Sequence, residues 1–252
     1  MTAGRFNVVI PARYASTRFP GKAIAELDGK PMIRHVYDQA CSSNAAQVVI
    51  ATDDERIADV AKDFGADVAM TRADHASGTD RIAEVAQARG WSDETIVVNV
   101  QGDAPLIPGS SIDQVAMLLD AHESASLATL CAALEDPADV DDPNIVKVVF
   151  DQGGRALYFS RSPIPAVARA GEPPSGFWWH VGIYAYRVAA LMQLARTPVC
   201  ELERAEKLEQ LRALYHGMEI RIAVADALPG PDINTPADLV VAERFIAGRG
   251  SA

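Results

Sequence analysis

The chain has 252 residues, of which 49% are hydrophobic and 23% are charged, and its formal net charge is −11. The composition is typical of a soluble globular protein, and the length fits either one large α/β domain or two small ones. The acidic balance argues against a nucleic-acid-binding surface, which needs clustered cations. No apolar run reaches the roughly 18 residues that cross a bilayer, and the first residues lack the apolar core of a signal peptide.

The three cysteines, Cys41, Cys131 and Cys200, are widely spaced and form no CxxC pair. An odd number of isolated cysteines is typical of reduced thiols in a protein of a reducing compartment. We therefore expect a cytoplasmic protein without disulfide bonds.

The first predicted strand, at 6–10, opens into a loop that carries three cations. Pro11 ends the strand because proline has no N–H to donate to the ladder. Arg13, Arg18 and Lys22 follow it, with small residues between them. Small residues let backbone N–H groups approach oxygen atoms, and both arginine and lysine bind phosphates. The spacing alone predicts either a polyphosphate site or an ordinary solvated loop.

Strands and helices alternate over the first hundred residues. Apolar, β-branched runs predict the strands, and apolar side chains at helical spacing predict the helices. After the strand at 6–10, we predict a helix beginning after Pro31, a strand at 47–51, a helix capped by Thr52 or Asp53 and ended by Gly65, a strand at 66–70, a helix at 79–89 and a strand at 95–100. This order predicts an α/β fold, a three-layer and mostly parallel sheet with helices on both faces.

Polar segments follow these strands at the points where each strand ends. In parallel α/β sheets, ligands bind beyond the carboxyl ends of the strands, so the polar segments predict a binding site there. A dinucleotide-binding dehydrogenase is a competing class, because Asp53 and Asp54 could mimic its ribose-binding acid. However, GxGxxG occurs nowhere in the chain, and a helix cap accounts for these aspartates more simply.

Asp103 directly follows the strand at 95–100, after Gly102 and before a proline turn. A carboxylate held there is a hard oxygen ligand, of the kind that Mg²⁺ takes together with phosphate oxygens. The alternative is a plain turn residue. We treat Asp103 as the main candidate for a metal ligand.

The rest of the chain adds further helices and strands. We predict a helix at 111–121, a strand at 125–133, an acidic loop at 135–142, a β-hairpin at 144–161, a loop at 162–176, a strand at 177–187, one helix at 201–216, a strand at 220–225 and a last helix capped by Asn234 or Thr235. We expect a single domain over 1–252, in which 144–187 forms a β-rich insertion for sugar binding or dimerisation.

Several segments resemble one family over most of the chain: PARYASTRFPGK, TRADHASGTDR, NVQGDAP, ALYFSR and LEQLR. They resemble the bacterial cytidylyltransferases that activate acidic sugars, and most closely the 3-deoxy-manno-octulosonate (Kdo) cytidylyltransferase family. The resemblance implies transfer of CMP from CTP to 3-deoxy-D-manno-octulosonate, with release of pyrophosphate, for lipopolysaccharide synthesis. It also implies Mg²⁺ as a cofactor and a homodimer.

The resemblance further implies roles for individual residues. Catalysis and phosphate binding would rest on Arg13, Arg18, Lys22 and Asp103. The nucleotide would be bound by Ala12, Arg13, Arg72, Ser77, Gly78 and Gln101. The acidic sugar would be bound by Arg161, His180, Tyr184, Glu209 and Gln210. Mg²⁺ would be bound by Asp103 and Asn234.

Without the resemblance, several of these residues have plainer interpretations. Ser77 and Gly78 read as an ordinary capped start of a helix. His180 reads as a structural histidine, although Tyr184 lies on the same face of the predicted strand. Glu209 and Gln210 read as part of a solvated helix face.

The chain also departs from the family pattern. Ala104 stands where Glu is usual, Trp179 where a basic residue precedes the HxGxYxY pattern, and Asn234 where Asp is the second metal ligand; the loop at 162–176 is short. An amide oxygen can coordinate Mg²⁺, and Asp232 could compensate for the missing charge. Another acidic sugar, such as 8-amino-Kdo or a sialic acid, therefore stays open, as does a non-catalytic nucleotide-binding protein.

Overall fold

The computed structural model describes residues 6–16, 18–166 and 176–249. A nine-stranded sheet forms its centre, with the path β11-β7-β10-β6-β1-β4-β5, and β8 and β9 are attached beside β10. β1 runs parallel to both β4 and β6, β4 to β5 and β7 to β11, whereas β10 is antiparallel to β6 and β7. The predicted α/β fold with a mostly parallel sheet is confirmed.

The strands of this sheet begin and end close to the predicted positions. They are β1 (Phe6–Ala12), β4 (Gln47–Thr52), β5 (Asp67–Met70), β6 (Ile96–Asn99), β7 (Leu127–Ala133), β8 (Lys147–Phe150), β9 (Ala156–Ser160), β10 (Trp178–Arg187) and β11 (Ile220–Val224). Two further short strands, β2 (Glu26–Leu27) and β3 (Lys30–Pro31), pair around a turn in which Asp28 and Gly29 both have positive φ.

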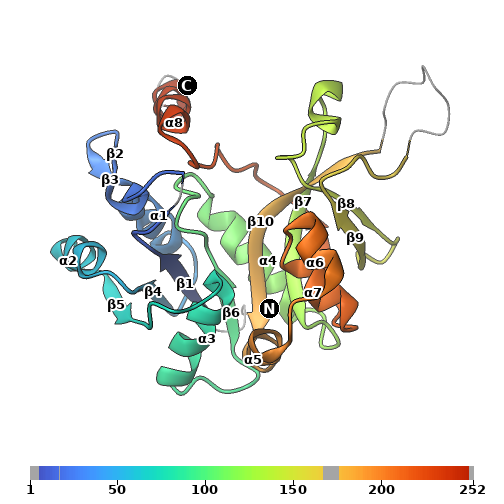
Figure 1. Ribbon diagram of the computed structural model, residues 1–252, viewed down its shortest axis with the longest axis horizontal. Helices are drawn as coiled ribbons and strands as arrows, with labels where there is room; N and C mark the ends of the chain where they lie inside the picture. Colours follow the sequence, from blue (N-terminus) through green and yellow to red (C-terminus); the bar gives the residue numbers. More distant parts are fainter. Residues whose placement is uncertain (1–5, 17, 167–175, 250–252) are drawn as a thin grey trace.

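Helices cover both faces of the sheet (Figure 1). The α-helices are α1 (Met32–Cys41), α2 (Glu55–Asp63), α3 (Gly78–Ala88), α4 (Gly109–Asp120), α5 (Val188–Arg196), α6 (Glu201–Glu206), α7 (Gln210–Tyr215) and α8 (Pro236–Arg249). Two short 3₁₀ helices, η1 (Lys22–Ile24) and η2 (Pro137–Val140), complete the set. η2 lies in the segment that we predicted as an acidic loop.

Alternate side chains of β1 enter two different cores, which explains why its sequence is apolar throughout. Val8 and Ile10 pack in the core beneath α1 and α4, whereas Val9 packs in the core beneath α3, α5 and α7. A strand covered on both faces has no solvent side, so it needs no polar alternation. A third, smaller core joins Ile233 and Ala242 of the C-terminal segment to Leu27 and Met32.

The structure corrects three predictions of local detail. The helix predicted at 201–216 is two short helices, because Lys207 adopts a left-handed conformation (φ 55°, ψ 43°) that ends α6. The cap of α2 is Asp54, whose side chain accepts a hydrogen bond from the Arg56 backbone N–H, rather than Thr52 or Asp53. The helix α5 was not predicted at all.

The β-rich segment at 144–187 divides between two places. β8 and β9 form the predicted hairpin, which joins the sheet through the pairing of Lys147 with Trp179. β10 instead runs through the middle of the sheet, between β6 and β7. Most of the predicted loop at 162–176 lies outside the described residues.

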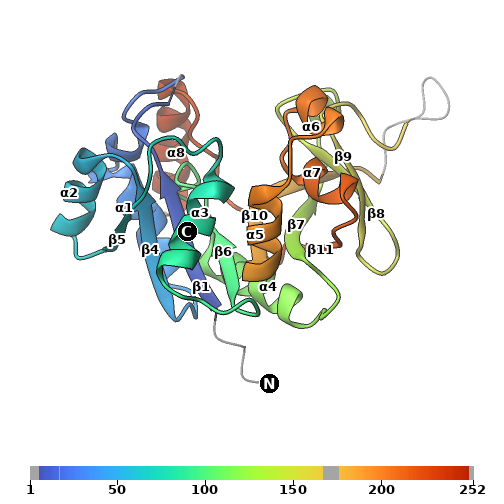
Figure 2. The same cartoon turned by 60° about the horizontal axis from the view of Figure 1, so that its bottom comes forward.

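The two outer parts of the sheet lie on opposite sides of β6 and β10, and the C-terminal helix α8 lies on the side of β1 (Figures 1 and 2). β1, β4 and β5 are on one side, and β7 to β9 with α6 and α7 are on the other. Residues of both halves can therefore face a ligand placed between them. Among the described residues, no helix is long and apolar enough to cross a membrane.

Candidate active site

A cavity of about 970 Å³ lies where β1 and β6 end, with walls from both halves of the chain. Ala12 contributes from the end of β1, Gln101 from the loop after β6, and Glu209 from the start of α7. This is the edge of the sheet at which the polar segments predicted a binding site. Gln101 is held by a hydrogen bond of 2.7 Å from its Nε2 to the Gly182 carbonyl of β10.

The cationic loop after β1 forms one wall, and Arg13, Arg18 and Lys22 all line the cavity. The Tyr14 carbonyl accepts hydrogen bonds from the backbone N–H groups of Ser16 and Gly21, each at 2.9 Å, and this bends the loop back on itself. The Arg56 guanidinium lies 3.3 Å from the centroid of the Tyr14 ring. The ring is partly buried and packs against the core, and the cation–π contact adds to what holds it in place. The loop therefore presents its cations on a backbone that is tied at both ends.

Asp103 lies opposite this loop and pairs with it. Its Oδ2 is 2.6 Å from Lys22 Nζ, and Lys22 Nζ also donates to the Ile233 carbonyl at 3.3 Å. The Ile233 N–H in turn donates to the Asp103 carbonyl at 2.9 Å. The last segment of the chain thus completes the wall, because α8 and the small core around Ile233 hold it against Lys22 and Asp103.

Two further oxygen donors lie in this corner of the cavity, Asp232 and Asn234. The pKa of Asp232 is raised to about 7, mainly by burial and then by the negative charge of Asp103, whereas Lys22 lowers it. The Asn234 Oδ1 accepts a hydrogen bond of 2.8 Å from Arg18 Nη2. Two carboxylates and an amide oxygen fit Mg²⁺, which usually takes one or two carboxylates and completes its shell with water and phosphate oxygens.

Across the described residues, no group of three or more His, Cys, Asp or Glu side chains could hold a metal ion by itself. An ion bound by Asp103 and its neighbours would therefore depend on ligand oxygens from a substrate. This dependence is typical of Mg²⁺ sites that bind phosphates.

The start of α3 forms the next part of the wall, with Ser77 and Gly78 lining the cavity. Ser77 and Asp80 form a capping box: the Ser77 Oγ accepts from the Asp80 N–H at 3.2 Å, and the Asp80 Oδ2 accepts from the Ser77 N–H at 3.1 Å. The box fixes the helix start, whose dipole favours anionic or carbonyl groups. The plain interpretation of a capped helix is thus correct, and the same residues also face the cavity.

The opposite end of the cavity is lined by the predicted sugar residues. Arg161 donates from Nε to the Glu206 carbonyl and from Nη1 to the Pro143 carbonyl, both at 2.7 Å. His180 Nε2 is 3.0 Å from Thr129 Oγ1, and its ring centroid lies 5.2 Å from that of Tyr184. Burial lowers the pKa of His180 to about 3, so the imidazole is neutral at physiological pH.

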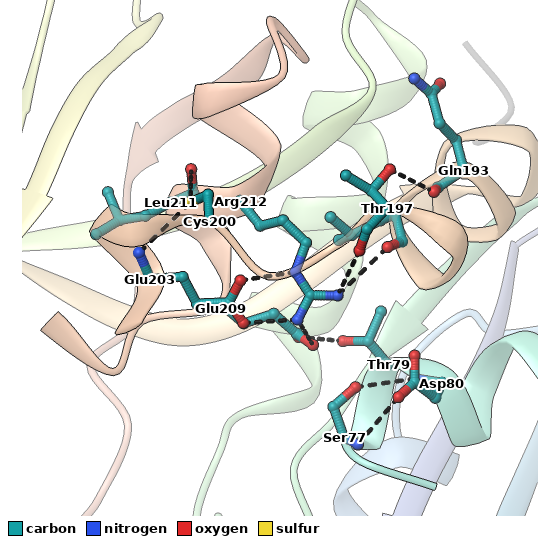
Figure 3. Close-up of polar contacts among 11 residues, drawn as sticks. Ser77, Thr79, Asp80, Gln193, Thr197, Cys200, Glu203, Glu209, Leu211 and Arg212 are labelled. Atoms are coloured by element: carbon teal, nitrogen blue, oxygen red, sulfur yellow. Dashed lines mark hydrogen bonds and ion pairs between the residues drawn. The ribbon is translucent and has the colours of Figure 1, made fainter. Parts of the chain in front are cut away.

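Glu209 is part of a network of polar contacts that joins α7 to α3 (Figure 3). One of its oxygens, Oε2, accepts a hydrogen bond from the Thr79 hydroxyl in the first turn of α3. Arg212 Nη2 lies 3.8 Å from Oε1 and is itself held by Glu203, whose two oxygens accept from Arg212 Nε at 2.7 Å and Nη2 at 2.6 Å. Burial raises the pKa of Glu209, whereas the Thr79 hydrogen bond and the Arg212 charge lower it.

Comparison with known proteins shows the family of the chain. A family model described as cytidylyltransferase matches residues 7–220. The 3-deoxy-manno-octulosonate cytidylyltransferase of Thioalkalivibrio sulfidiphilus is 50% identical, covering 96% of this chain and 98% of the relative. The enzyme of the same name from Pseudomonas fluorescens is 52% identical, with the same coverage of both chains. The chain belongs to the cytidylyltransferase family.

A solved structure of CMP:2-keto-3-deoxy-manno-octonic acid synthetase complexed with CTP superposes with a TM-score of 0.91. It is 40% identical in sequence and covers 98% of this chain and 100% of its own. The similarity therefore extends over both halves of the fold.

The structure does not bring every predicted residue of the cytidylyltransferase site into the cavity. Arg72 lies outside the cavity wall, is 69% exposed and forms a two-point ion pair with Asp74, at 2.9 and 2.6 Å. The other predicted residues, including Gln210 at the start of α7, line the cavity. The three cysteines are free thiols, of which Cys41 is exposed.

Sequence reasoning missed Thr79, Arg212 and Lys207. Thr79 was noted only as part of a helix start, although its position beside Ser77 and Gly78 placed it on the cavity side. Arg212 belongs to the LEQLR segment, and its burial to 7% exposure was not predictable from helical spacing. The sequence predicts a continuous helix through Lys207, and nothing in it indicates that this residue lines the cavity.

Proposed function

We propose that this cytidylyltransferase transfers CMP from CTP to 3-deoxy-D-manno-octulosonate, giving CMP-Kdo and pyrophosphate for lipopolysaccharide synthesis. The observation that carries the proposal is a single cavity with a cationic loop and two aspartates at one end and Arg161, His180 and Glu209 at the other. A nucleoside triphosphate matches the first end, and a polyhydroxylated acid matches the second.

The loop cations would bind the β- and γ-phosphates of CTP. The anomeric hydroxyl of the sugar attacks the α-phosphorus, and the bond between that phosphorus and the oxygen leading to the β-phosphate breaks. Arg13, Arg18 and Lys22 would then stabilise the negative charge that builds up on the departing pyrophosphate. Such a reaction depends on positioning and electrostatic stabilisation rather than on a covalent enzyme intermediate.

Mg²⁺ is the cofactor that we propose, held by Asp103 together with Asn234 and Asp232. A bound Mg²⁺ supplies positive charge to phosphate oxygens and orients them. The fit of two neighbouring carboxylates, one of them with a raised pKa, supports this assignment, because such a pair favours a cation between its members. Asp232 would provide the charge that Asn234 lacks.

The start of α3 would bind the cytosine base through Ser77 and Gly78, and Gln101 would contact the nucleotide from the loop after β6. Arg161, His180, Tyr184, Glu209 and Gln210 would bind the sugar. Neutral His180 can accept or donate one hydrogen bond without adding charge, which suits a sugar hydroxyl.

We also propose that two copies of the chain form a dimer. Leu157 on β9 is 53% exposed, and Tyr215 on the neighbouring α7 is 60% exposed. Among the strands described, β9 pairs with β8. Exposed apolar side chains beside a strand edge favour association with a second copy. Light scattering coupled to size exclusion should give the mass of a dimer, and Leu157→Asp should lower it to that of the monomer.

A pyrophosphate-release assay tests the reaction. The purified chain is mixed with each of the four nucleoside triphosphates and with Kdo, 8-amino-Kdo or a sialic acid, with and without Mg²⁺. We expect release with CTP, Kdo and Mg²⁺, and at least tenfold less with the other pairs.

The other outcomes identify the alternatives. Faster release with a different acidic sugar would assign the chain to that sugar. CTP binding without pyrophosphate release from any pair would indicate a non-catalytic nucleotide-binding protein. Undiminished release in EDTA would remove Mg²⁺ from the proposal.

A further inference from the structure

Lys207 has an unusual backbone conformation for its residue type. It ends α6 with φ 55° and ψ 43°, and its N–H donates to the Glu203 carbonyl at 2.8 Å. Glycine or asparagine usually takes this left-handed position, because the Cβ atom of other residues lies too close to the following carbonyl oxygen, and only asparagine or aspartate offsets this with a local hydrogen bond. Among the described residues, one other non-glycine residue has positive φ, Asp28, which lies in a tight turn where aspartate is common. A lysine at such a position points to a use for its side chain.

Lys207 is one of the residues that line the cavity. It makes no ion pair with any residue that the structure describes. Two other cations of the wall, Lys22 and Arg81, are each paired with a carboxylate: Lys22 with Asp103 at 2.6 Å and Arg81 with Asp53 at 3.0 Å. Lys207 thus adds an unbalanced positive charge at the end of the cavity away from the phosphate-binding loop.

A second cation lies beside it. Arg161 Nε donates to the carbonyl of Glu206, the residue directly before Lys207. The Glu206 carboxylate is already engaged, because Oε1 accepts from the Ser160 hydroxyl at 2.7 Å and Oε2 from the Arg161 N–H at 2.9 Å. Both carboxylate oxygens of Glu206 therefore accept hydrogen bonds from Ser160 and Arg161, and the ammonium of Lys207 stays available for an anion from outside the chain.

We propose that Lys207 binds the carboxylate of the acidic sugar and so contributes to the choice of a sugar acid over a neutral sugar. The inference rests on the proposed function, which brings two anionic substrates into one cavity. Arg13, Arg18 and Lys22 serve the triphosphate at one end, and the carboxylate needs a cation at the other. Hydrogen bonds between an ammonium and a carboxylate are about twice as strong as neutral ones, so the pair discriminates by charge.

Lys207→Met removes the charge and keeps the length of the side chain. In the pyrophosphate-release assay we expect the KM for the sugar to rise about 10- to 100-fold, the range for a lost charge-assisted hydrogen bond, with the KM for CTP within twofold. Lys207→Arg should recover part of the sugar affinity. Lys62→Met is the matched control, because Lys62 lies on α2 and pairs with Asp59 at 3.5 Å.

The carboxamide of the sugar separates a direct contact from an indirect one. Replacing the acid by the carboxamide should raise the sugar KM of the wild type by about the same factor as the Lys207→Met substitution does with the acid. In the Lys207→Met variant, the carboxamide should raise the sugar KM little further. A variant that discriminates against the carboxamide as strongly as the wild type does would overturn the inference, as would an unchanged sugar KM.

Lys207→Gly tests whether the residue is retained for the fold. Glycine accepts the left-handed conformation without strain, so the melting temperature of this variant should equal or exceed that of the wild type while the sugar KM rises. A fall in both stability and affinity would indicate a structural role and contradict the inference. Absence of turnover by the wild type with every acidic sugar would instead remove the proposed function itself, and this inference with it.

Discussion

Asp103 is the residue on which the proposed chemistry depends most. Asp103→Asn keeps the shape of the side chain but removes the charge that pairs with Lys22 and that would hold Mg²⁺. We expect kcat to fall by about 10²- to 10³-fold or more, in the range for losing one electrostatic contact to a reacting group. Steady-state pyrophosphate release measures kcat, and far-UV circular dichroism checks the fold.

The control for this change is Asp113→Asn, which removes a carboxylate remote from the cavity that accepts hydrogen bonds from Asn44 at 2.8 and 2.7 Å. It should alter stability slightly and kcat within twofold. If Asp103→Asn retained most of the wild-type kcat, Asp103 would not be part of the reaction.

Gly102 fixes the position of Asp103 by close packing. A Cβ at Gly102 would lie 2.7 Å from the carbonyl oxygen of Pro11, and that backbone atom cannot rotate away as a side chain does. Gly102→Ala should therefore displace the loop, lower kcat about 10²-fold and destabilise the fold by about 1–3 kcal/mol. Urea unfolding and steady-state assays measure the two effects.

Gly248→Ala provides the comparison, because nothing lies within 4 Å of a Cβ at that helical position. Alanine there should stabilise α8 by up to about 1 kcal/mol and leave kcat unchanged. If both substitutions changed kcat and the free energy of unfolding equally, the close approach of Gly102 to Pro11 would not matter for activity.

The predictable part of the site was the part that follows directly from strand ends. Arg13, Asp103 and Gln101 come just after β1 and β6, so parallel topology alone brought them together. The contact between Thr79 and Glu209 joins residues 130 positions apart and was not predictable, because it depends on how α7 packs over the sheet. The position of Arg72 was not predictable either, because it depends on a local ion pair with Asp74, and Arg72 does not line the cavity.

At the scale of elements, Thr79 and Glu209 join α3 to α7 across the cavity. Thr79→Val keeps the buried volume but removes the donor to a carboxylate oxygen, which then lacks its hydrogen bond. We expect kcat/KM for the sugar to fall about tenfold, which corresponds to about 1.4 kcal/mol, while the dissociation constant of CTP changes less than twofold. Isothermal titration with CTP and assays with varied sugar concentration separate the two.

Thr197→Val is a matched control within the same network (Figure 3). The Thr197 hydroxyl donates to the Gln193 carbonyl at 2.8 Å and touches no carboxylate, so its loss should leave the sugar KM unchanged. Should both valine variants weaken sugar binding alike, general loosening of the helices would explain the result better than orientation of Glu209.

Most elements were predictable from hydrophobic periodicity, and the exceptions have physical causes. The segment 201–216 has helical spacing throughout, yet the chain turns at Lys207 so that Leu208 and Leu211 reach the core beneath the helices. Tertiary packing overrode local propensity there. α5 was missed because it follows β10 without an intervening loop, its cap position being the last strand residue, Arg187, which makes no side-chain capping bond.

At the scale of the whole molecule, the site is assembled from segments that are distant in the sequence. The cavity is lined from β1, α3, β10, the start of α7 and the segment before α8. In the proposed function, β1 and α3 would bind the nucleotide, β10 and α7 the sugar, and the segment before α8 would complete the Mg²⁺ site. Ile233 is fully buried in the small core that holds this last segment. Global stability and the geometry of the site are therefore linked.

The pH dependence of stability reports on His180, which lines the cavity. The centroid of its ring lies 5.1 Å from that of Phe159 and 5.2 Å from that of Tyr184, and burial lowers the pKa of His180 from 6.5 to about 3. Below pH 6.5 the unfolded chain binds a proton that the folded chain refuses, so the free energy of unfolding falls as the pH drops from 6.5 toward 3.

At pH 5 the loss due to His180 alone should be about 2 kcal/mol relative to pH 8. His180→Gln keeps a hydrogen-bonding group near Thr129 without titrating, so the stability difference between wild type and variant should shrink by that amount between pH 8 and pH 5. Urea unfolding at several pH values measures the difference, and subtraction of the two curves removes the carboxylates common to both. Parallel curves for wild type and His180→Gln would mean that the folded and unfolded chains bind a proton at this imidazole with the same pKa, which would contradict the lowered pKa of His180.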